Sequence, residues 1–259
     1  MTEKTEYLDI NDEKILDLDA NEGGGFIAFT NHKTVVTPDH KFIIDIELRA
    51  PIIRRLDDDK FLIADCRTNS GLNGHVYDFT GQKMNVFHLG DGIEDIIVNN
   101  GKIIVAYFDE GVFGKDGPNN DGVAVFDFEG NQEFGFNSSA IWGGIDDCYC
   151  ICKHGRNKVL FYAYDALKVY ELNLDTLIVE KYETPADFAG ASAISSKQGK
   201  IILHSSYNDK RSFFLWDRDK RRVEKIGSYA SRLKGIANGK FFAFGEKGYT
   251  IVDPTEYEF

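Results

Sequence analysis

Residues 93–108 read IEDIIVNNGKIIVAYF, two short apolar runs joined by the polar turn NNG. The second half of this phrase, a polar turn followed by a lysine and an apolar run, recurs along the chain. Successive copies are 40 to 56 residues apart, and their lysines are Lys60, Lys102, Lys158, Lys200 and Lys240. Self-similarity at a period of roughly 40 to 50 residues, built from short strands and turns, is typical of a propeller.

Each repeat reads as four strands. In residues 93–140 these are IEDIIV, KIIVAYF, GVAVFDF and QEFGFN, separated by turns or loops. The neighbouring repeats copy the third strand and the turn after it, with an acid at Asp78, Asp127, Glu171 or Asp217. Repeats are expected at 13–50, 52–90, 93–140, 145–185, 190–230 and 232–259. The sequence predicts an all-β fold, a six-bladed β-propeller of four-stranded antiparallel blades. Five blades are the alternative, if residues 15–48 supply only part of a blade.

The last repeat is one strand short, which ring closure would explain. A propeller is commonly closed by a strand from one terminus that completes the blade begun by the other, and closure hides strand edges. Here Tyr7–Ile10 is expected to pair with the strand GYTIVD near Ile251. We therefore expect residues 1–259 to form a single propeller domain, without an interdomain linker.

Composition and charge exclude several classes of protein. The 259 residues are 42% hydrophobic and 13% aromatic, as a folded β domain requires. The net charge of −12 would repel a phosphate backbone, so we expect no nucleic-acid partner. There is no apolar run of about 18 residues, and the acidic N-terminal stretch MTEKTEYLDINDEK lacks the pattern of a secretory signal. We expect a cytoplasmic protein with no membrane partner.

The cysteines agree with a reducing compartment. Cys148, Cys150 and Cys152 alternate along one predicted strand, so they are expected to share one face, and Cys66 lies far away in the sequence. The CxC spacing differs from the knuckles of structural zinc sites. Packing in the core is the expected role of these thiols.

The repeats resemble those of bacterial β-propellers of the NHL-repeat and WD-repeat groups. The stretch 90–130, with GDGIEDIIV, VAYFDEGVFG and GVAVFDFEGN, is similar to an uncharacterised family of bacterial propeller-like proteins. The Gly-His and Trp-Asp signature of WD repeats is represented only by Trp216 and Asp217. The resemblance implies a fold and no particular activity.

Acidic residues gather where second strands end and inner strands begin. In an up-and-down blade these positions lie at the same end of the ring, so we expect an acidic face around the mouth of the central channel. Its candidate ligand-binding residues are Asp65, Glu94, Asp109, Glu110, Trp142, Asp146, Asp165 and Asp209. Trp142 would offer a stacking surface, and the insertion GVFGKDGPNNDG around Pro118 would be a flexible loop beside it. The alternatives are that the acids cap turns and that Trp142 fills a gap between blades.

Two functions from different classes remain. The first is a non-catalytic propeller whose acidic face binds an unknown protein, a basic peptide or a small ligand. The second is a divalent-metal-dependent hydrolase of lactonase or esterase type. Propellers of the gluconolactonase and regucalcin type hold a divalent metal at the channel through Glu, Asp and Asn, and the acids here are similar in kind. By that resemblance Glu94, Asp109, Asp146 and Asp209 would hold a cation such as calcium.

Catalytic residues are not assigned by any motif. The sequence has no GxSxG elbow, no GxxxxGK[ST] loop and no HExxH pair. If the protein is a hydrolase, Asp165 would be the general base. A third reading is a purely structural propeller without a ligand. Whether the protein is an enzyme stays open at this point.

Overall fold

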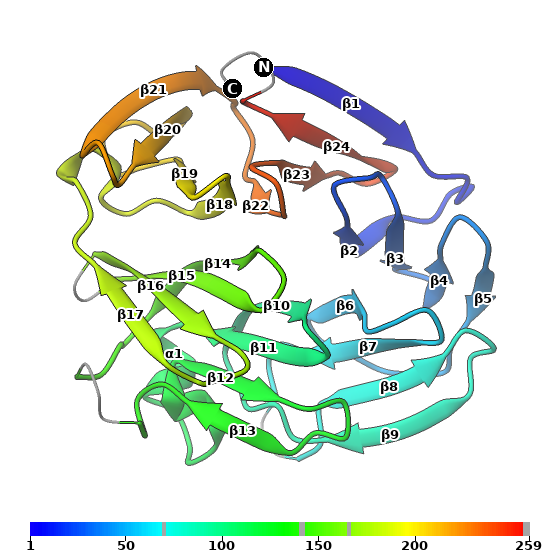
Figure 1. The fold of residues 1–259 in the computed structure, drawn as a ribbon. Helices are drawn as coiled ribbons and strands as arrows, with labels where there is room; N and C mark the ends of the chain where they lie inside the picture. The colour runs from blue at the N-terminus through cyan, green and yellow to red at the C-terminus, as the bar shows by residue number, and fades with distance from the viewer. Residues whose placement is uncertain (69–70, 140–142, 165–166, 256–259) are drawn as a thin grey trace.

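The computed structural model describes residues 1–68, 71–139, 143–164 and 167–255. These residues form six four-stranded antiparallel sheets arranged in a ring around a central channel (Figure 1). The prediction of a six-bladed β-propeller is confirmed, and the five-blade alternative is wrong. The repeating lysines begin the second strands β7, β11, β15 and β19, and Lys240 directly precedes β23.

The first three blades have these strands, from the channel outward. Blade 1 consists of β2 (Ile15–Ala20), β3 (Phe26–Thr30), β4 (Thr34–Val36) and β5 (Lys41–Ile43). Blade 2 consists of β6 (Pro51–Arg55), β7 (Lys60–Asp65), β8 (Gly74–Asp78) and β9 (Lys83–Phe87). Blade 3 consists of β10 (Ile93–Asn99), β11 (Lys102–Tyr107), β12 (Val123–Phe126) and β13 (Gln132–Gly135).

The other three blades follow the same order. Blade 4 consists of β14 (Cys148–His154), β15 (Lys158–Ala163), β16 (Lys168–Asn173) and β17 (Val179–Tyr182). Blade 5 consists of β18 (Ala193–Lys197), β19 (Lys200–His204), β20 (Ser212–Asp217) and β21 (Arg222–Ser228). Blade 6 consists of β22 (Lys234–Gly235), β23 (Phe241–Phe244), β24 (Gly248–Asp253) and the N-terminal β1 (Thr2–Tyr7).

Closure of the ring occurs in blade 6, where β1 is the outermost strand. It pairs antiparallel with β24, from Thr2 opposite Asp253 to Tyr7 opposite Gly248, which brings the two ends of the chain together (Figure 1). The predicted partner strand is correct, but the closing strand is Thr2–Tyr7, so Tyr7 is the only residue of the predicted segment Tyr7–Ile10 that belongs to it. An outermost strand is largely exposed and needs no apolar pattern, so the polar TEKTEY can form it, whereas Ile10 is 1% exposed and packs in the core.

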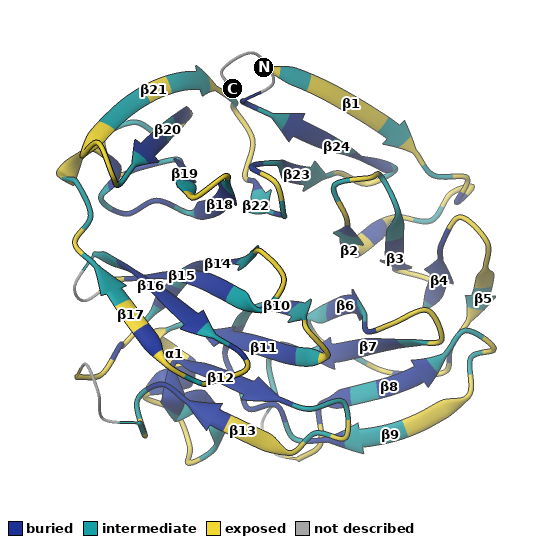
Figure 2. Cartoon of the chain, viewed as in Figure 1, coloured by how far each residue is buried: buried dark blue, intermediate teal, exposed yellow. Residues whose placement is uncertain are grey.

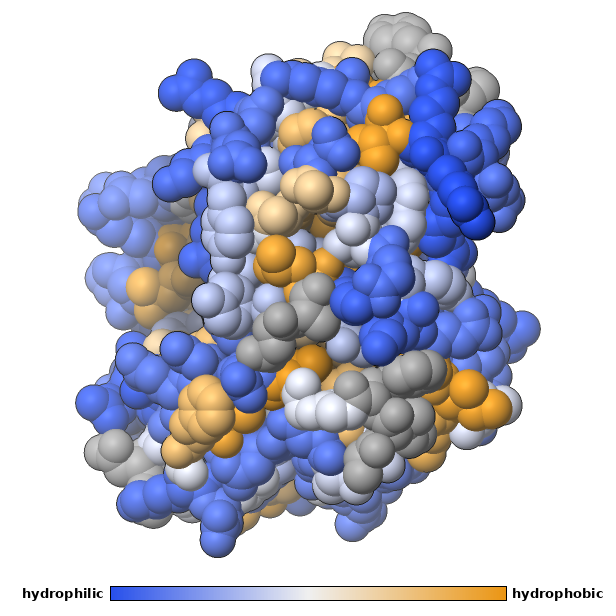
Figure 3. All heavy atoms as spheres, turned by 90° about the vertical axis from the view of Figure 1, so that its left-hand side faces the viewer, coloured by the Kyte–Doolittle hydropathy of each residue, from blue (hydrophilic) through white to orange (hydrophobic). Residues whose placement is uncertain are grey.

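The outermost strand is the most exposed strand of each blade (Figure 2). The second strands are almost wholly buried; Phe161 and Tyr162 of β15, for example, are each in contact with a different neighbouring blade. The side of the ring that carries β17 and β21 is mainly hydrophilic, with small separate hydrophobic patches (Figure 3). Among the described residues, no helix is long and apolar enough to cross a membrane.

The insertion in blade 3 is folded, contrary to the expected flexible loop. It contains α1 (Asp109–Val112) and the 3-10 helix η1 (Pro118–Asp121); a second 3-10 helix, η2 (Ala186–Phe188), precedes blade 5. The buried Asn119 donates hydrogen bonds to the carbonyl oxygens of Gly111 (2.6 Å) and Lys115 (3.0 Å). A polar side chain that satisfies the backbone from inside holds the insertion against blade 3.

Three inner strands begin with a β-bulge, at the same place in blades 1, 3 and 4. The irregularities lie between Ile15 and Asp17, between Ile93 and Asp95, and between Cys148 and Cys150. The bulge in β14 changes the alternation, so Cys148 packs towards blade 3 while Cys150 and Cys152 pack towards blade 5. The prediction that the three cysteines share a face is therefore wrong. All four cysteines are buried free thiols, as expected for packing residues.

Candidate functional site

A cavity of about 560 Å³ lies at the end of the ring where the inner strands begin. We call it the channel-mouth cavity. It is formed between the inner strands of blades 3 and 4, the loops that flank β18 and β19 of blade 5, and the segment that leads into β22. Its wall contains two acids, two cations and three aromatic rings: Glu94, Asp147, Lys210, Arg232, Phe108, Tyr149 and Tyr207.

Two bulges direct side chains into this cavity. Glu94 and Tyr149 are the extra residues at the bulges of β10 and β14, and both line the wall. An extra residue breaks the regular alternation of a strand and turns its side chain in a direction that a regular strand would not give. The bulges thus place a carboxylate and a phenol at equivalent positions of adjacent blades.

Glu94 forms the main ion pair of the cavity. One of its carboxylate oxygens lies 2.6 Å from Nη2 of Arg232. The two side chains are unequally buried, since Glu94 is 26% exposed and Arg232 is 77% exposed. Burial raises the pKa of Glu94 to about 7, Arg232 opposes this, and the neighbouring Asp95 adds to it. The carboxylate is therefore ionised near neutral pH only with the help of nearby cations.

The aromatic side of the cavity is built around Tyr149 and Tyr207. Their hydroxyl oxygens lie 2.5 Å apart and share a hydrogen bond. The ring of Tyr149 also packs against that of Tyr164, with centroids 5.6 Å apart. Gly190 lies beneath Tyr207 with a φ of +75°, and a Cβ there would be 2.3 Å from Cε1 of that ring. Glycine is thus needed both for the backbone and for the position of Tyr207.

A second cavity of about 330 Å³ adjoins the first. Besides Glu94 and Arg232, which line both cavities, its wall contains Lys234 and a set of apolar residues. We call the part formed by Ile52, Leu233, Phe242, Ala243 and Phe244 the apolar recess. The Glu94–Arg232 ion pair therefore lies where the channel-mouth cavity and the apolar recess meet.

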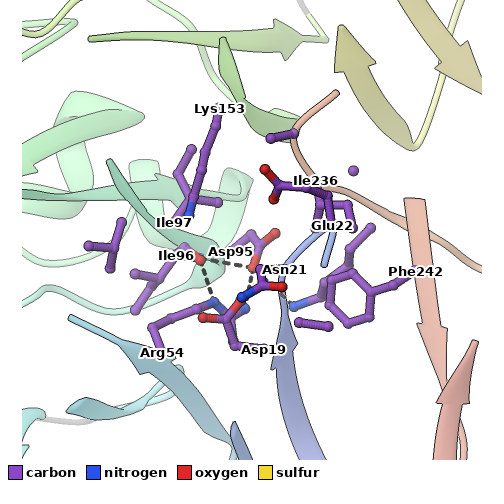
Figure 4. A pocket seen from close by; sticks show the side chains of 15 residues that line it. Asp19, Asn21, Glu22, Arg54, Asp95, Ile96, Ile97, Lys153, Ile236 and Phe242 are labelled. Atoms are coloured by element: carbon purple, nitrogen blue, oxygen red, sulfur yellow. Dashed lines mark hydrogen bonds and ion pairs between the residues drawn. The ribbon is translucent and has the colours of Figure 1, made fainter. Parts of the chain in front are cut away.

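Farther along the channel, a buried charge network joins four blades; Figure 4 shows its Arg54 and Asp95. Arg54 of β6 is 4% exposed; it lies 2.6 Å from a carboxylate oxygen of Asp17 on β2 and 2.6 Å from one of Asp95 on β10. It also donates a hydrogen bond to the carbonyl oxygen of Ile96. Lys234 of β22 lies 2.9 Å from Asp95. These cations hold the pKa of Asp95 below its usual range against the opposing effect of burial.

The network adjoins a much narrower cavity. Arg54, Asp95 and Lys234 form part of the wall of this cavity. Its volume is only about 30 Å³, which is room for little more than a water molecule. Asp19 and Lys153 also face this narrow space (Figure 4). This space is too small for an organic ligand, whereas the channel-mouth cavity has room for one.

The predicted site residues have several different positions. Glu94 lines the channel-mouth cavity. Asp109 and Asp146 are exposed and do not line it, but the adjacent Phe108 and Asp147 do. Trp142 and Asp165 lie outside the described residues.

The other three predicted acids serve local structure. Asp65 accepts hydrogen bonds from the backbone nitrogens of Arg49 and Ala50, each at 3.0 Å. Glu110 forms an ion pair with Arg67 at 2.6 Å. Asp209 accepts from Lys225 at 2.7 Å and from Ser212 at 2.6 Å, and the Lys225 ammonium is the main reason that its pKa lies below its usual range. The alternative from the sequence, in which acids cap turns, describes Asp209, which also accepts from the backbone nitrogens of Arg211 and Ser212. The ion pair of Glu110 is a different role.

The four proposed metal ligands are not brought together. Within the part of the chain that the structure describes, no group of three or more His, Cys, Asp or Glu is arranged to hold a metal ion. Glu94 is engaged with Arg232 and Asp209 with Lys225. Binding of calcium by Glu94, Asp109, Asp146 and Asp209 therefore has no support from their geometry and stays a prediction.

Several residues of the site were missed by reasoning from the sequence. Tyr207 and Lys210 lie in SSYNDK, the same loop from which Asp209 was selected. Arg54 stands in the apolar segment PIIRRL, where a cation in an inner strand was a usable signal of a channel charge. Arg232 gave no such signal, because its partner is 138 residues away in the sequence.

Comparison with known proteins bears on the fold. No protein-family model matches the sequence, and a search of curated proteins finds no match. The similarity is to solved β-propellers. Virginiamycin B lyase from Staphylococcus aureus is 9% identical with a TM-score of 0.53, over 97% of this chain and 99% of that one. A streptogramin B lyase structure is 10% identical with a TM-score of 0.56, over 96% and 97% of the two chains.

A further similar structure comes from a different kind of protein. The extracellular domain of a putative hybrid two-component system from B. thetaiotaomicron is 14% identical with a TM-score of 0.59. The match covers 93% of this chain and 34% of that one. At such low identities the similarity shows the β-propeller fold alone, because unrelated activities share this scaffold.

Proposed function

We propose that this protein is a non-catalytic binding propeller that holds a small ligand in the channel-mouth cavity. The observation that carries the proposal is the convergence of charged and aromatic side chains from several blades on one cavity of about 560 Å³. This volume is within the range of small-molecule sites, roughly 300 to 1,000 Å³. A buried charge network from four different blades lies close by, since its Asp95 directly follows Glu94 and its Lys234 lines the adjoining cavity.

The charge of the cavity wall differs from that of the acidic face expected from the sequence. The cavity wall contains Lys210 and Arg232 as well as Glu94 and Asp147, so it is of mixed charge. Three aromatic rings add apolar surface on which a ligand can stack. A small ligand with polar and apolar parts fits such a wall better than an extended basic peptide, which would seek a uniformly acidic surface.

Blocking the cavity tests the proposal. Ala230 is exposed and lines the cavity, so Ala230→Trp should fill it without disturbing the core. Ile178→Trp, in the exposed turn between β16 and β17, is the matched control. A panel of cationic, zwitterionic, anionic and neutral aromatic compounds would be screened against the wild type by ligand-observed NMR. Affinities for each hit would then be measured by calorimetry.

The expected result is a loss of affinity of at least tenfold in Ala230→Trp and an unchanged affinity in Ile178→Trp. Equal binding by both variants would place the ligand elsewhere. Failure of the whole panel to bind the wild type at millimolar concentration would count against a small-molecule site. Repeating the screen after chelator treatment, with and without added calcium and with ester and lactone substrates, tests the hydrolase alternative.

The cellular location and the repeat group of this propeller also stay proposals. A cytoplasmic location is supported by four buried cysteines that form no disulfide. The similar B. thetaiotaomicron domain is extracellular, but its likeness concerns the fold alone. Membership of the NHL-repeat or WD-repeat groups is supported only by the repeats themselves.

A further inference from the structure

The ion pair between Glu94 and Arg232 indicates the chemical class of the ligand. We propose that the ligand is a small amine or guanidine with an apolar substituent, and that its cationic group takes the place of Arg232 at Glu94. This inference rests on the proposed function, because it concerns the same cavity. Its basis is the position of the pair between the channel-mouth cavity and the apolar recess.

The first step concerns the cation. Arg232 shows that a guanidinium fits against Glu94, with 2.6 Å between nitrogen and oxygen. The pair is nevertheless unequal, since Glu94 is fixed on a bulge of an inner strand whereas Arg232 is mostly exposed and comes from the segment before β22. An exposed arginine loses little when it returns to water, because surface ion pairs contribute only about 0 to 1 kcal/mol. Arg232 is therefore the partner that a ligand can replace.

The second step concerns the charge that remains. With Arg232 displaced into solvent, the channel-mouth cavity has Glu94 and Asp147 on its wall against Lys210. Lys234 adjoins the recess but is engaged with Asp95 at 2.9 Å and lies 3.7 Å from Asp17. The cavity would then have a formal charge of −1. A monocation restores neutrality and keeps the half-buried carboxylate of Glu94 paired.

The third step concerns the apolar substituent. Glu94 is bordered on one side by the rings of Phe108, Tyr149 and Tyr207 and on the other by the apolar recess. A ligand bound through its cation at Glu94 has apolar surface within reach in both directions. Burial of an aliphatic or aromatic group there adds about 25 cal/mol for each Å² removed from water. Aromatic rings also attract a cation placed over their faces.

A matched set of probes tests the inference. The 4-phenylbutyl group would be presented as an amine, a guanidine, a neutral alcohol and a carboxylate, with butylamine as the probe that lacks the ring. Binding would be measured by calorimetry at pH 8, where Glu94 is mainly ionised. The variants are Arg232→Ala, Glu94→Gln and, as control, Arg222→Ala, whose side chain is 67% exposed and pairs with Glu224.

The amine and guanidine should bind the wild type at least tenfold more tightly than the alcohol or the carboxylate. Arg232→Ala should increase their affinity up to about fivefold by removing a competitor whose ion pair is worth about 1 kcal/mol or less. Glu94→Gln should lower it about tenfold, and Arg222→Ala should leave it unchanged. Butylamine should bind more weakly than the phenylbutyl probe. Weaker binding of the cations to Arg232→Ala than to the wild type would overturn the inference.

The outcomes also separate this inference from the proposed function. If the carboxylate or the alcohol binds best, with affinity lost in Ala230→Trp but not in Glu94→Gln, the cavity is a ligand site and the cationic class is wrong. If no probe in this set or in the wider panel binds either the wild type or Arg232→Ala, the proposed function itself fails. Melting temperatures of all variants, expected no more than a few degrees below the wild type and above it for Glu94→Gln at pH 8, would show that losses of affinity are not losses of folding.

Discussion

Glu94 should make the stability of this propeller depend on pH in a defined direction. Burial raises its pKa in the folded state to about 7, from an ordinary value of 4.5. The folded protein therefore binds this proton more tightly than the unfolded chain, and stability falls as pH rises from about 4.5 to about 7. At about 1.36 kcal/mol for each pKa unit, ionised Glu94 costs about 3 kcal/mol at pH 8 and under about 1 kcal/mol at pH 5.

The substitution Glu94→Gln removes this titration while retaining the size of the side chain. We expect the variant to gain about 2 to 3 kcal/mol relative to the wild type between pH 5 and pH 8. Urea unfolding at both pH values, followed by circular dichroism, measures the free energy of unfolding. Glu110→Gln is the control, because Glu110 is also paired with an arginine at 2.6 Å but its side chain is 65% exposed. An equal difference between Glu94→Gln and the wild type at both pH values would refute the reasoning.

Three further predictions concern the ring. Arg54→Ala leaves two carboxylates buried in the channel and should lower the free energy of unfolding by about 3 to 5 kcal/mol; a loss under about 1 kcal/mol in urea titration would contradict this. Gly190→Ala should cost about 1 kcal/mol through its positive φ and displace the ring of Tyr207, which a crystal structure of the variant would show; an unmoved ring would argue against the clash. Deleting Thr2–Tyr7 uncovers the edge of β24, so the melting temperature should fall and light scattering should show aggregation; a stable monomer would show that closure by β1 is dispensable.

The parts of the fold that could be predicted from the sequence are those governed by local patterns. A turn, a lysine and an apolar run mark the second strand in blades 2 to 6, because these strands are buried on both faces and must be apolar. The closing strand follows no such pattern. TEKTEY is mostly exposed at the rim and is recognised only by its pairing with β24, whereas the sequence pattern points to Tyr7–Ile10.

The site could be predicted only in part, for two physical reasons. First, side chains no longer alternate regularly between the two faces of a strand at a bulge. The bulges that direct Glu94 and Tyr149 into the cavity leave no mark in the sequence. Second, acids at loop positions have competing roles, and only contacts decide among them. Asp65 accepts hydrogen bonds from two backbone nitrogens, whereas Glu94 faces a cavity, although the sequence pattern places both at the same end of the ring.

The two arginines near the channel show how position decides the role of a charge. Arg54 is 4% exposed and is held by carboxylates from two other blades, so removing it would leave buried charge that nothing from solvent can easily compensate. Arg232 is exposed and held at one carboxylate, at the meeting point of two cavities. The first arrangement fixes the blades to one another. The second arrangement leaves Glu94 with a partner that a soluble cation can replace. A ligand can therefore bind at Glu94 without breaking the ion pairs that join the blades.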